Sequence, residues 1–344
     1  MSLTYEQAGV DISHTDAVKK EMGAFINSDD ARVLNGLGPF ASLYDISFPE
    51  IKEPVLVLKA EEPGSKQKMA MEYGYAESIC HDMINHLIND IAVMGAKPLA
   101  VLDTVVCGEA DAEIMKCIIK GLSEACRDNE CSLVGGETSV QPGVVDKGTY
   151  ILTSSVAGII DKNKIIDASR IKPGDAVLAA ASNGLHTNGY SLVRLIMNKK
   201  PEIINEIING ETFIQAVMKP HTAYYKTIKN LFNEKGVTGF AHITGGGIEG
   251  NLNRIIPNGL CAEIDLSKIK MPPLFKLLQK YGGVGEAEML RTFNCGVGLV
   301  VVARPDIKDH VIRHISRGCD CYVIGRVDES TDVNEKIKFV NSLR

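Results

Sequence analysis

Residues 98–138 read PLAVLDTVVCGEADAEIMKCIIKGLSEACRDNECSLVGGET and carry the clearest structural pattern of the chain. The apolar run over 98–108 predicts a strand, and the run over 131–138 predicts another. Between them, 111–129 predicts an amphipathic helix, with Asp111 as its N-terminal cap. A strand, a helix and a strand in succession indicate a mixed α/β layer structure.

The same alternation continues on both sides of this stretch. Strands are predicted over 54–60 and 148–160, and a helix over 77–96. This helix carries an apolar residue at every fourth position of one stripe, at Ile79, Met83, Leu87 and Ile91. The pattern therefore extends the α/β layer structure across the first half of the chain.

A polar segment with proline and glycine, DASRIKPGD, precedes a new strand. We place a domain boundary near residue 168, which divides the chain into domains 1–168 and 169–344. The second domain is predicted to be α/β as well. Its helices are expected over 189–198, 222–236 and 272–282, and its strands over 259–266, 295–303 and 321–327.

The composition excludes several classes of protein. The chain has 344 residues and a net charge of −6, so it lacks the basic excess that binding to nucleic acid requires. It contains no apolar run of about 20 residues for a membrane span, and its first residues are too polar for a secretion signal. We therefore expect a cytoplasmic protein. The nine cysteines are interpreted as reduced thiols that pack as small apolar groups, including Cys295.

Glycine-rich clusters are the most informative feature for function, because glycine lets backbone N–H groups approach an anion closely. No G-x-x-x-x-G-K-[ST] motif occurs. GLGPFA, which starts at Gly36, matches a loose dinucleotide-binding pattern. Pro49 and Pro54 then exclude a good crossover helix, so a nicotinamide enzyme is disfavoured.

Six ordered blocks resemble those of the phosphoribosylformylglycinamidine cyclo-ligases, also called aminoimidazole ribonucleotide synthetases. The blocks are YEQAGVDI (Tyr5–Ile12), NGLGPFASL, CSLVGGETSVQPG, SNGLHTNGYSLVR, HITGGG and EMLRTFNCGVGL. The resemblance extends from about Leu3 to about Val327. HTNGYSLVR and RTFNCGVG are typical of this enzyme and disfavour other members of its superfamily, such as thiamine-phosphate kinase and selenophosphate synthetase.

The resemblance implies an α/β, two-domain synthetase whose N-terminal sheet pairs with that of a second subunit into a barrel. It implies ATP-dependent ring closure of formylglycinamidine ribonucleotide to aminoimidazole ribonucleotide in purine biosynthesis, by way of an iminophosphate. ATP and magnesium are implied as cofactors, potassium as a further ion, and a homodimer as the assembly.

The segment KAEEPGSK (Lys59–Lys66) stands where the family usually has G-T-D-G-V-G-T-K. The resemblance implies that Gly64, Ser65 and Lys66 contact the triphosphate and that Glu61 ligates magnesium. Glu62 and Pro63 depart from the pattern, because a carboxylate repels phosphate and proline offers no N–H. An alternative is therefore a nucleotide-binding or ribonucleotide-binding homologue with impaired catalysis. The family's P-T-R-I-Y also reads PHTAY here, which leaves Thr222 in place of an arginine.

Further site residues combine their sequence context with the resemblance. Asp90 shares a helix stripe with Asp82 and His86, which is either a solvated face or, as the resemblance implies, a magnesium or nucleotide contact. The resemblance implies that Gly135 and Gly136 contact the nucleotide. Glu137, which follows them, is either a helix cap or a metal ligand, and Asp103 is a weaker candidate. The catalytic candidates are His186, which suits proton transfer, and Asn188. Gly245, Gly246 and Gly247 form either a tight strand-to-helix turn or an anion-binding loop, with the ribose phosphate as the expected occupant.

Overall fold

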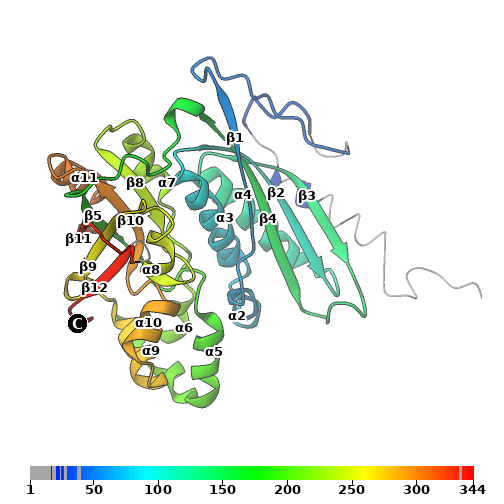
Figure 1. Cartoon of the computed structure of the whole chain (residues 1–344). Coiled ribbons are helices and arrows are strands. Elements are labelled where there is room, and N and C mark those ends of the chain that lie inside the picture. Colours follow the sequence, from blue (N-terminus) through cyan, green and yellow to red (C-terminus); the bar gives the residue numbers. More distant parts are fainter. Residues whose placement is uncertain (1–16, 18–20, 24, 27–28, 37–39, 333–334) are drawn as a thin grey trace, which may run out of the picture. The chain divides into compact units, whose positions relative to one another are not determined.

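The computed structural model describes residues 17, 21–23, 25–26, 29–36, 40–332 and 335–344. The predicted block Tyr5–Ile12 and part of the GLGPFA motif lie outside these residues. The chain forms two compact units, Met1–Ile91 with Lys97–Asp161, and Ala92–Ala96 with Lys162–Arg344 (Figure 1). The units divide after Asp161, whereas the sequence placed the boundary near residue 168.

The first unit is built on an open sheet of four strands in the order β1-β4-β2-β3. Strands β2 and β3 run parallel and are joined by helix α4, which confirms the predicted strand-helix-strand unit, and the other pairs are antiparallel. The elements are β1 (Pro54–Glu61), α2 (Lys66–Glu72), α3 (Ala76–Ala92), β2 (Lys97–Cys107), α4 (Ala112–Asp128), β3 (Ser132–Val140) and β4 (Tyr150–Asp161).

Helices α3 and α4 cover one face of this sheet (Figure 1). The Asp111 side chain accepts hydrogen bonds from the backbone N–H groups of Glu113 and Ile114, which confirms the predicted cap of α4. The predicted stripe of α3 is buried at all four positions. On the other face of the sheet, apolar side chains are exposed on β1, β2 and β4, at Leu56, Leu58, Leu102 and Ile151.

The second unit contains a six-stranded sheet in the order β12-β9-β11-β5-β10-β8. Its strands are β5 (Ala176–Ala181), β8 (Val237–His242), β9 (Leu260–Asp265), β10 (Val297–Ala303), β11 (Cys321–Glu329) and β12 (Ile337–Val340). A short hairpin, β6 (Ile207–Ile208) and β7 (Glu211–Thr212), lies apart from this sheet. All pairs are antiparallel except β12 with β9. The neighbouring interior strands β5 and β10 consist almost entirely of buried residues, which places them in the core.

The helices of the second unit are α5 (Tyr190–Lys199), α6 (Phe213–Val217), α7 (Tyr225–Ile228), α8 (Gly247–Leu252), α9 (Pro273–Gly282), α10 (Glu286–Thr292) and α11 (Lys308–Ile315). The helix predicted over 222–236 was wrong in its extent, because α7 has four residues and a 3-10 turn follows it. Phe232 instead packs against Phe240 of β8, and Gly236 passes close to Ile307. Among the described residues, no helix is both long and apolar enough to cross a membrane.

Candidate functional site

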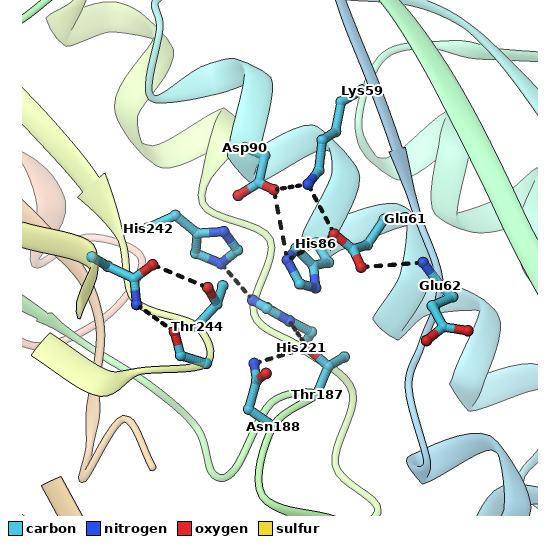
Figure 2. A network of polar contacts seen from close by, with 12 residues as sticks. Lys59, Glu61, Glu62, His86, Asp90, Thr187, Asn188, His221, His242 and Thr244 are labelled. Atoms are coloured by element: carbon cyan, nitrogen blue, oxygen red, sulfur yellow. Dashed lines mark hydrogen bonds and ion pairs between the residues drawn. The ribbon is translucent and has the colours of Figure 1, made fainter. Parts of the chain in front are cut away.

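A cluster of charged groups in the first unit joins strand β1 to helix α3 (Figure 2). Lys59 Nζ lies 3.0 Å from Glu61 Oε2 and 3.2 Å from Asp90 Oδ2. His86 Nε2 lies 3.6 Å from the same Glu61 oxygen and 3.7 Å from Asp90 Oδ2. Alternate residues of a strand share a face, and residues four apart share a helix stripe, so the local folds bring these side chains together.

The two carboxylates that the sequence assigned to magnesium thus converge on one positive charge. Burial alone would lower the pKa of Lys59, but the hydrogen bond to Glu61 and the charge of Asp90 outweigh it and raise that pKa. Two converging carboxylates beside an imidazole form a donor set that suits a divalent cation. The residues therefore fit magnesium, provided that the half-exposed Lys59 side chain moves out of the position.

Lys66, predicted to contact phosphate, forms a buried ion pair with Asp82 inside the first unit. It is the first residue of α2, its side chain is 0% exposed, and its Nζ lies 2.7 Å from Asp82 Oδ2. Burial lowers the pKa of Lys66 and the charge of Asp82 opposes this change. The stripe of α3 is not a solvated face, because Asp82 and His86 are buried. A phosphate contact by Lys66 stays a prediction.

The rest of the altered loop lies at the entrance to α2. Gly64 has φ +63°, a left-handed conformation that favours glycine, and Ser65 precedes the first turn of the helix. The Glu62 side chain is exposed, and its backbone N–H donates to Glu61 Oε1 at 3.3 Å. The loop therefore directs Glu61 toward α3 and leaves Glu62 in solvent.

The glycine pair at the middle of β3 has a packing role. A Cβ atom at Gly136 would lie 2.1 Å from Asp103 Oδ1, and one at Gly135 would lie 3.0 Å from Ser42 Oγ. Asp103 is buried on β2, where burial raises its pKa to about 7 and the charge of Glu137 adds to this rise. Glu137 thus acts electrostatically on Asp103 on the neighbouring strand, and its role as a metal ligand stays a prediction.

In the second unit, three buried histidines come together from separate segments, and Figure 2 shows two of them, His221 and His242. His186 follows β5 in a left-handed conformation with φ +60° and stacks on His221, with 3.9 Å between ring centroids. His221 Nε2 lies 2.8 Å from Nε2 of His242, the last residue of β8. The sequence pointed to His186 and to the HITGGG block, which contains His242, but His221 was overlooked. The only available signal was the histidine at the second position of PHTAY, beside the noted Thr222.

The loops of Asn188 and of the triple glycine face each other in the same unit. A Cβ atom at Gly245 would lie 3.1 Å from Asn188 Oδ1, so the two loops are in close contact. The Asn251 side chain donates to the carbonyls of Gly245 and Gly247, which fixes the turn before α8. Gly246 and Gly247 have φ +91° and +62°. The structure therefore brings the loop of His186 and Asn188 against the loop of Gly245, and the roles of these residues stay predictions.

Comparison with known proteins defines the class. Residues 31–160 match the family described as AIR synthase related protein, N-terminal domain. Residues 172–338 match the family described as AIR synthase related protein, C-terminal domain. The two structural units thus correspond to two known domain families.

Individual relatives narrow this class. Phosphoribosylformylglycinamidine cyclo-ligase of Paraburkholderia phymatum is 41% identical over 301 residues, covering 87% of this chain and 84% of its own. The cyclo-ligase of Paraburkholderia xenovorans is 39% identical over 330 residues, covering 95% of this chain and 93% of its own. The chain belongs to the phosphoribosylformylglycinamidine cyclo-ligase family, whose members are ATP-dependent ligases that form a C–N bond.

Solved structures share the fold at lower identity. The hydrogenase maturation protein HypE of Escherichia coli superimposes with a TM-score of 0.70 at 18% identity, covering 95% of this chain and 94% of that chain. Thiamine-monophosphate kinase of Stenotrophomonas maltophilia superimposes with a TM-score of 0.68 at 16% identity, covering 95% of this chain and 97% of that chain. One HypE structure among these neighbours is a complex with ATP. At this identity the likeness concerns the fold alone, so the family assignment rests on the cyclo-ligases.

Proposed function

We propose that this chain converts formylglycinamidine ribonucleotide and ATP to aminoimidazole ribonucleotide, ADP and phosphate. The observation that carries the proposal is 38–41% identity to cyclo-ligases over most of the chain. ATP phosphorylates the formyl oxygen, the amidine-side nitrogen attacks the activated carbon, and the C–O bond breaks to expel phosphate and close the ring. The alternative of an impaired binding homologue gains no support from these comparisons.

His186 and Asn188 are proposed to serve the ring-closing step. His186 is 1% exposed, and its Nε2 lies 3.2 Å from Thr222 Oγ1, so its ring is held in one orientation. An imidazole can take the proton that the attacking nitrogen loses. Asn188, beside Gly245, offers an amide to orient the substrate, and the Gly245 to Gly247 loop is proposed to lie at the ribose phosphate.

Glu61 and Asp90 are proposed to hold magnesium when ATP binds, with Glu137 as a further carboxylate and potassium as an additional ion. When bound, magnesium would neutralise phosphate charge. Lys59 would then leave the carboxylate pair, and its ammonium would be available to a phosphate oxygen. Gly64, Ser65, Lys66, Gly135 and Gly136 are retained as proposed ATP-site residues. The ATP complex of a structural neighbour supports the choice of nucleotide.

The open face of the first sheet is proposed to pair with a second copy of the chain in the cytoplasm. Leu58 is 70% exposed and Leu56 is 55% exposed on neighbouring positions of this face. Exposed apolar side chains gathered on one face of a sheet mark an interaction surface. Sedimentation should find a dimer for the natural chain and a monomer for Leu58→Asp. An unchanged dimer in that variant would place the interface elsewhere.

The reaction is tested with purified protein, substrate, ATP, magnesium and potassium. We expect an aminoimidazole product, and we expect His186→Gln to lower kcat by about 10²–10⁴-fold with a smaller effect on KM. Surface variant His310→Gln is the matched control, because His310 is an exposed histidine on α11. Full activity of His186→Gln would remove His186 from the reaction, and absence of product in the natural protein would contradict the proposal.

A further inference from the structure

The three buried histidines of the second unit form a cluster that the proposed reaction does not fully use. His186, His221 and His242 are 1%, 1% and 5% exposed. One ring nitrogen from each lies within 4.8 Å of the others. Each comes from a different segment: the loop after β5, the segment before α7, and the end of β8. Tertiary folding alone brings them together, so the cluster is a feature of the folded unit.

The contact between His221 and His242 shows that at least one nitrogen lone pair points into the cluster. Their Nε2 atoms are 2.8 Å apart, and a hydrogen bond at this distance requires one nitrogen to donate and the other to accept. An imidazole with an inward lone pair is the form that ligates a metal. An ion between these two nitrogens would replace the shared proton.

The contact between His221 and His242 is close to the ligand spacing of a three-histidine metal site. Zinc–nitrogen bonds of about 2.0–2.1 Å in a tetrahedron separate ligand nitrogens by roughly 3.3 Å. The His221–His242 separation of 2.8 Å must widen slightly. His186 lies nearly parallel to His221, with 20° between the ring planes, so it must rotate about its side-chain bonds to reach the ion.

Two of the three imidazole rings also have a threonine hydroxyl group close to one of their nitrogens. Thr222 Oγ1 lies 3.2 Å from His186 Nε2, and Thr187 Oγ1 lies 3.5 Å from His221 Nδ1. Metal-binding histidines are commonly oriented by such an outer partner on the second ring nitrogen. For His221 this leaves Nε2, the atom that faces His242, as the ligand atom.

We propose that His186, His221 and His242 bind one divalent transition-metal ion of the zinc class, with a fourth position open to water or an anion. Histidine nitrogens favour zinc, cobalt, nickel and copper over magnesium. The inhibitory consequence rests on the proposed function: a metal-bound His186 cannot take the proton of the ring-closing step, so the ion inhibits the enzyme.

The binding test uses tag-free, metal-free full-length protein titrated with cobalt(II), whose visible absorption reports tetrahedral nitrogen coordination. We expect one cobalt per chain in the natural protein and displacement by zinc. His221→Thr should weaken cobalt binding at least tenfold and remove the tetrahedral band. The matched control is the double variant His310→Ala/His314→Ala, which removes the histidine pair of α11 and should leave the band unchanged.

Two further results keep the test decisive. His242→Asn should also lose the band, and circular dichroism of both single variants checks that they fold. Equal cobalt binding by natural protein and His221→Thr, or loss of binding only in the α11 variant, would overturn the proposal. Because binding is measured without turnover, its outcome is separate from that of the proposed reaction. In turnover assays, zinc should inhibit the natural enzyme at concentrations that leave any residual His221→Thr activity unaffected.

Discussion

Removal of the Lys59 ammonium should strengthen magnesium binding. Lys59 bridges Glu61 at 3.0 Å and Asp90 at 3.2 Å, so a metal ion must first break two ion pairs. Partly exposed ion pairs contribute about 0.2–1 kcal/mol each, which gives roughly 0.4–2 kcal/mol for the two. Since 1.4 kcal/mol corresponds to tenfold in affinity, Lys59→Met should tighten magnesium binding by about 2- to 30-fold.

The assay is the magnesium dependence of turnover at fixed ATP, together with direct magnesium titration of the nucleotide-bound protein. Lys59→Arg keeps the charge and should retain the natural magnesium requirement. Lys68→Met removes an exposed lysine of α2, controls for net charge, and should also change little. Unchanged or weaker magnesium binding in Lys59→Met would show that Lys59 does not compete with the metal, and the reasoning would fail.

Substitutions at Lys66, Asp103 and Gly136 test the packing of the first unit. Lys66→Met leaves the buried Asp82 carboxylate without its ammonium and should cost about 3–5 kcal/mol in urea unfolding, most of which Lys66→Met/Asp82→Leu should restore. Burial raises the pKa of Asp103 to about 7, against 3.8 for an exposed aspartate. The folded state therefore binds the Asp103 proton more tightly than the unfolded state does. As a result, the free energy of unfolding falls by up to roughly 4 kcal/mol as the pH rises from 4 to 7. Asp103→Asn should therefore raise Tm at pH 8 and leave it nearly unchanged at pH 4; equal changes at both would contradict the burial argument. Gly136→Ala should destabilise by about 1–3 kcal/mol because its Cβ meets the Asp103 carboxylate, whereas Gly285→Ala, with open space around it, should have little effect on the midpoint of unfolding.

Much of the fold was predictable from local signals. The cap at Asp111 and the apolar stripe of α3 are properties of a few neighbouring residues, and both were confirmed. Strand β8 was missed because it is buried at every position and so shows no alternation, and β12 was missed because it has only four residues. The extent of α7 depends on where Phe232 packs in the folded unit, so the sequence alone predicted too long a helix.

The site was less predictable, because its contacts join distant segments. The glycine loops pointed to the family, but nothing near Lys59 in sequence shows that its ammonium reaches Asp90 on α3. The Lys66–Asp82 pair likewise arises from the packing of α2 against α3. His221 was overlooked because a lone histidine has no neighbour in sequence that reveals its stacking on His186.

The central claim is that this chain couples ATP cleavage to imidazole ring closure. The most direct measurement follows substrate whose formyl oxygen carries a heavy isotope and quantifies aminoimidazole ribonucleotide, ADP and labelled phosphate together. Phosphorylation of that oxygen predicts equal amounts of all three, with the label transferred to phosphate. ADP without aminoimidazole ribonucleotide, or ring closure that leaves phosphate unlabelled, would contradict the account.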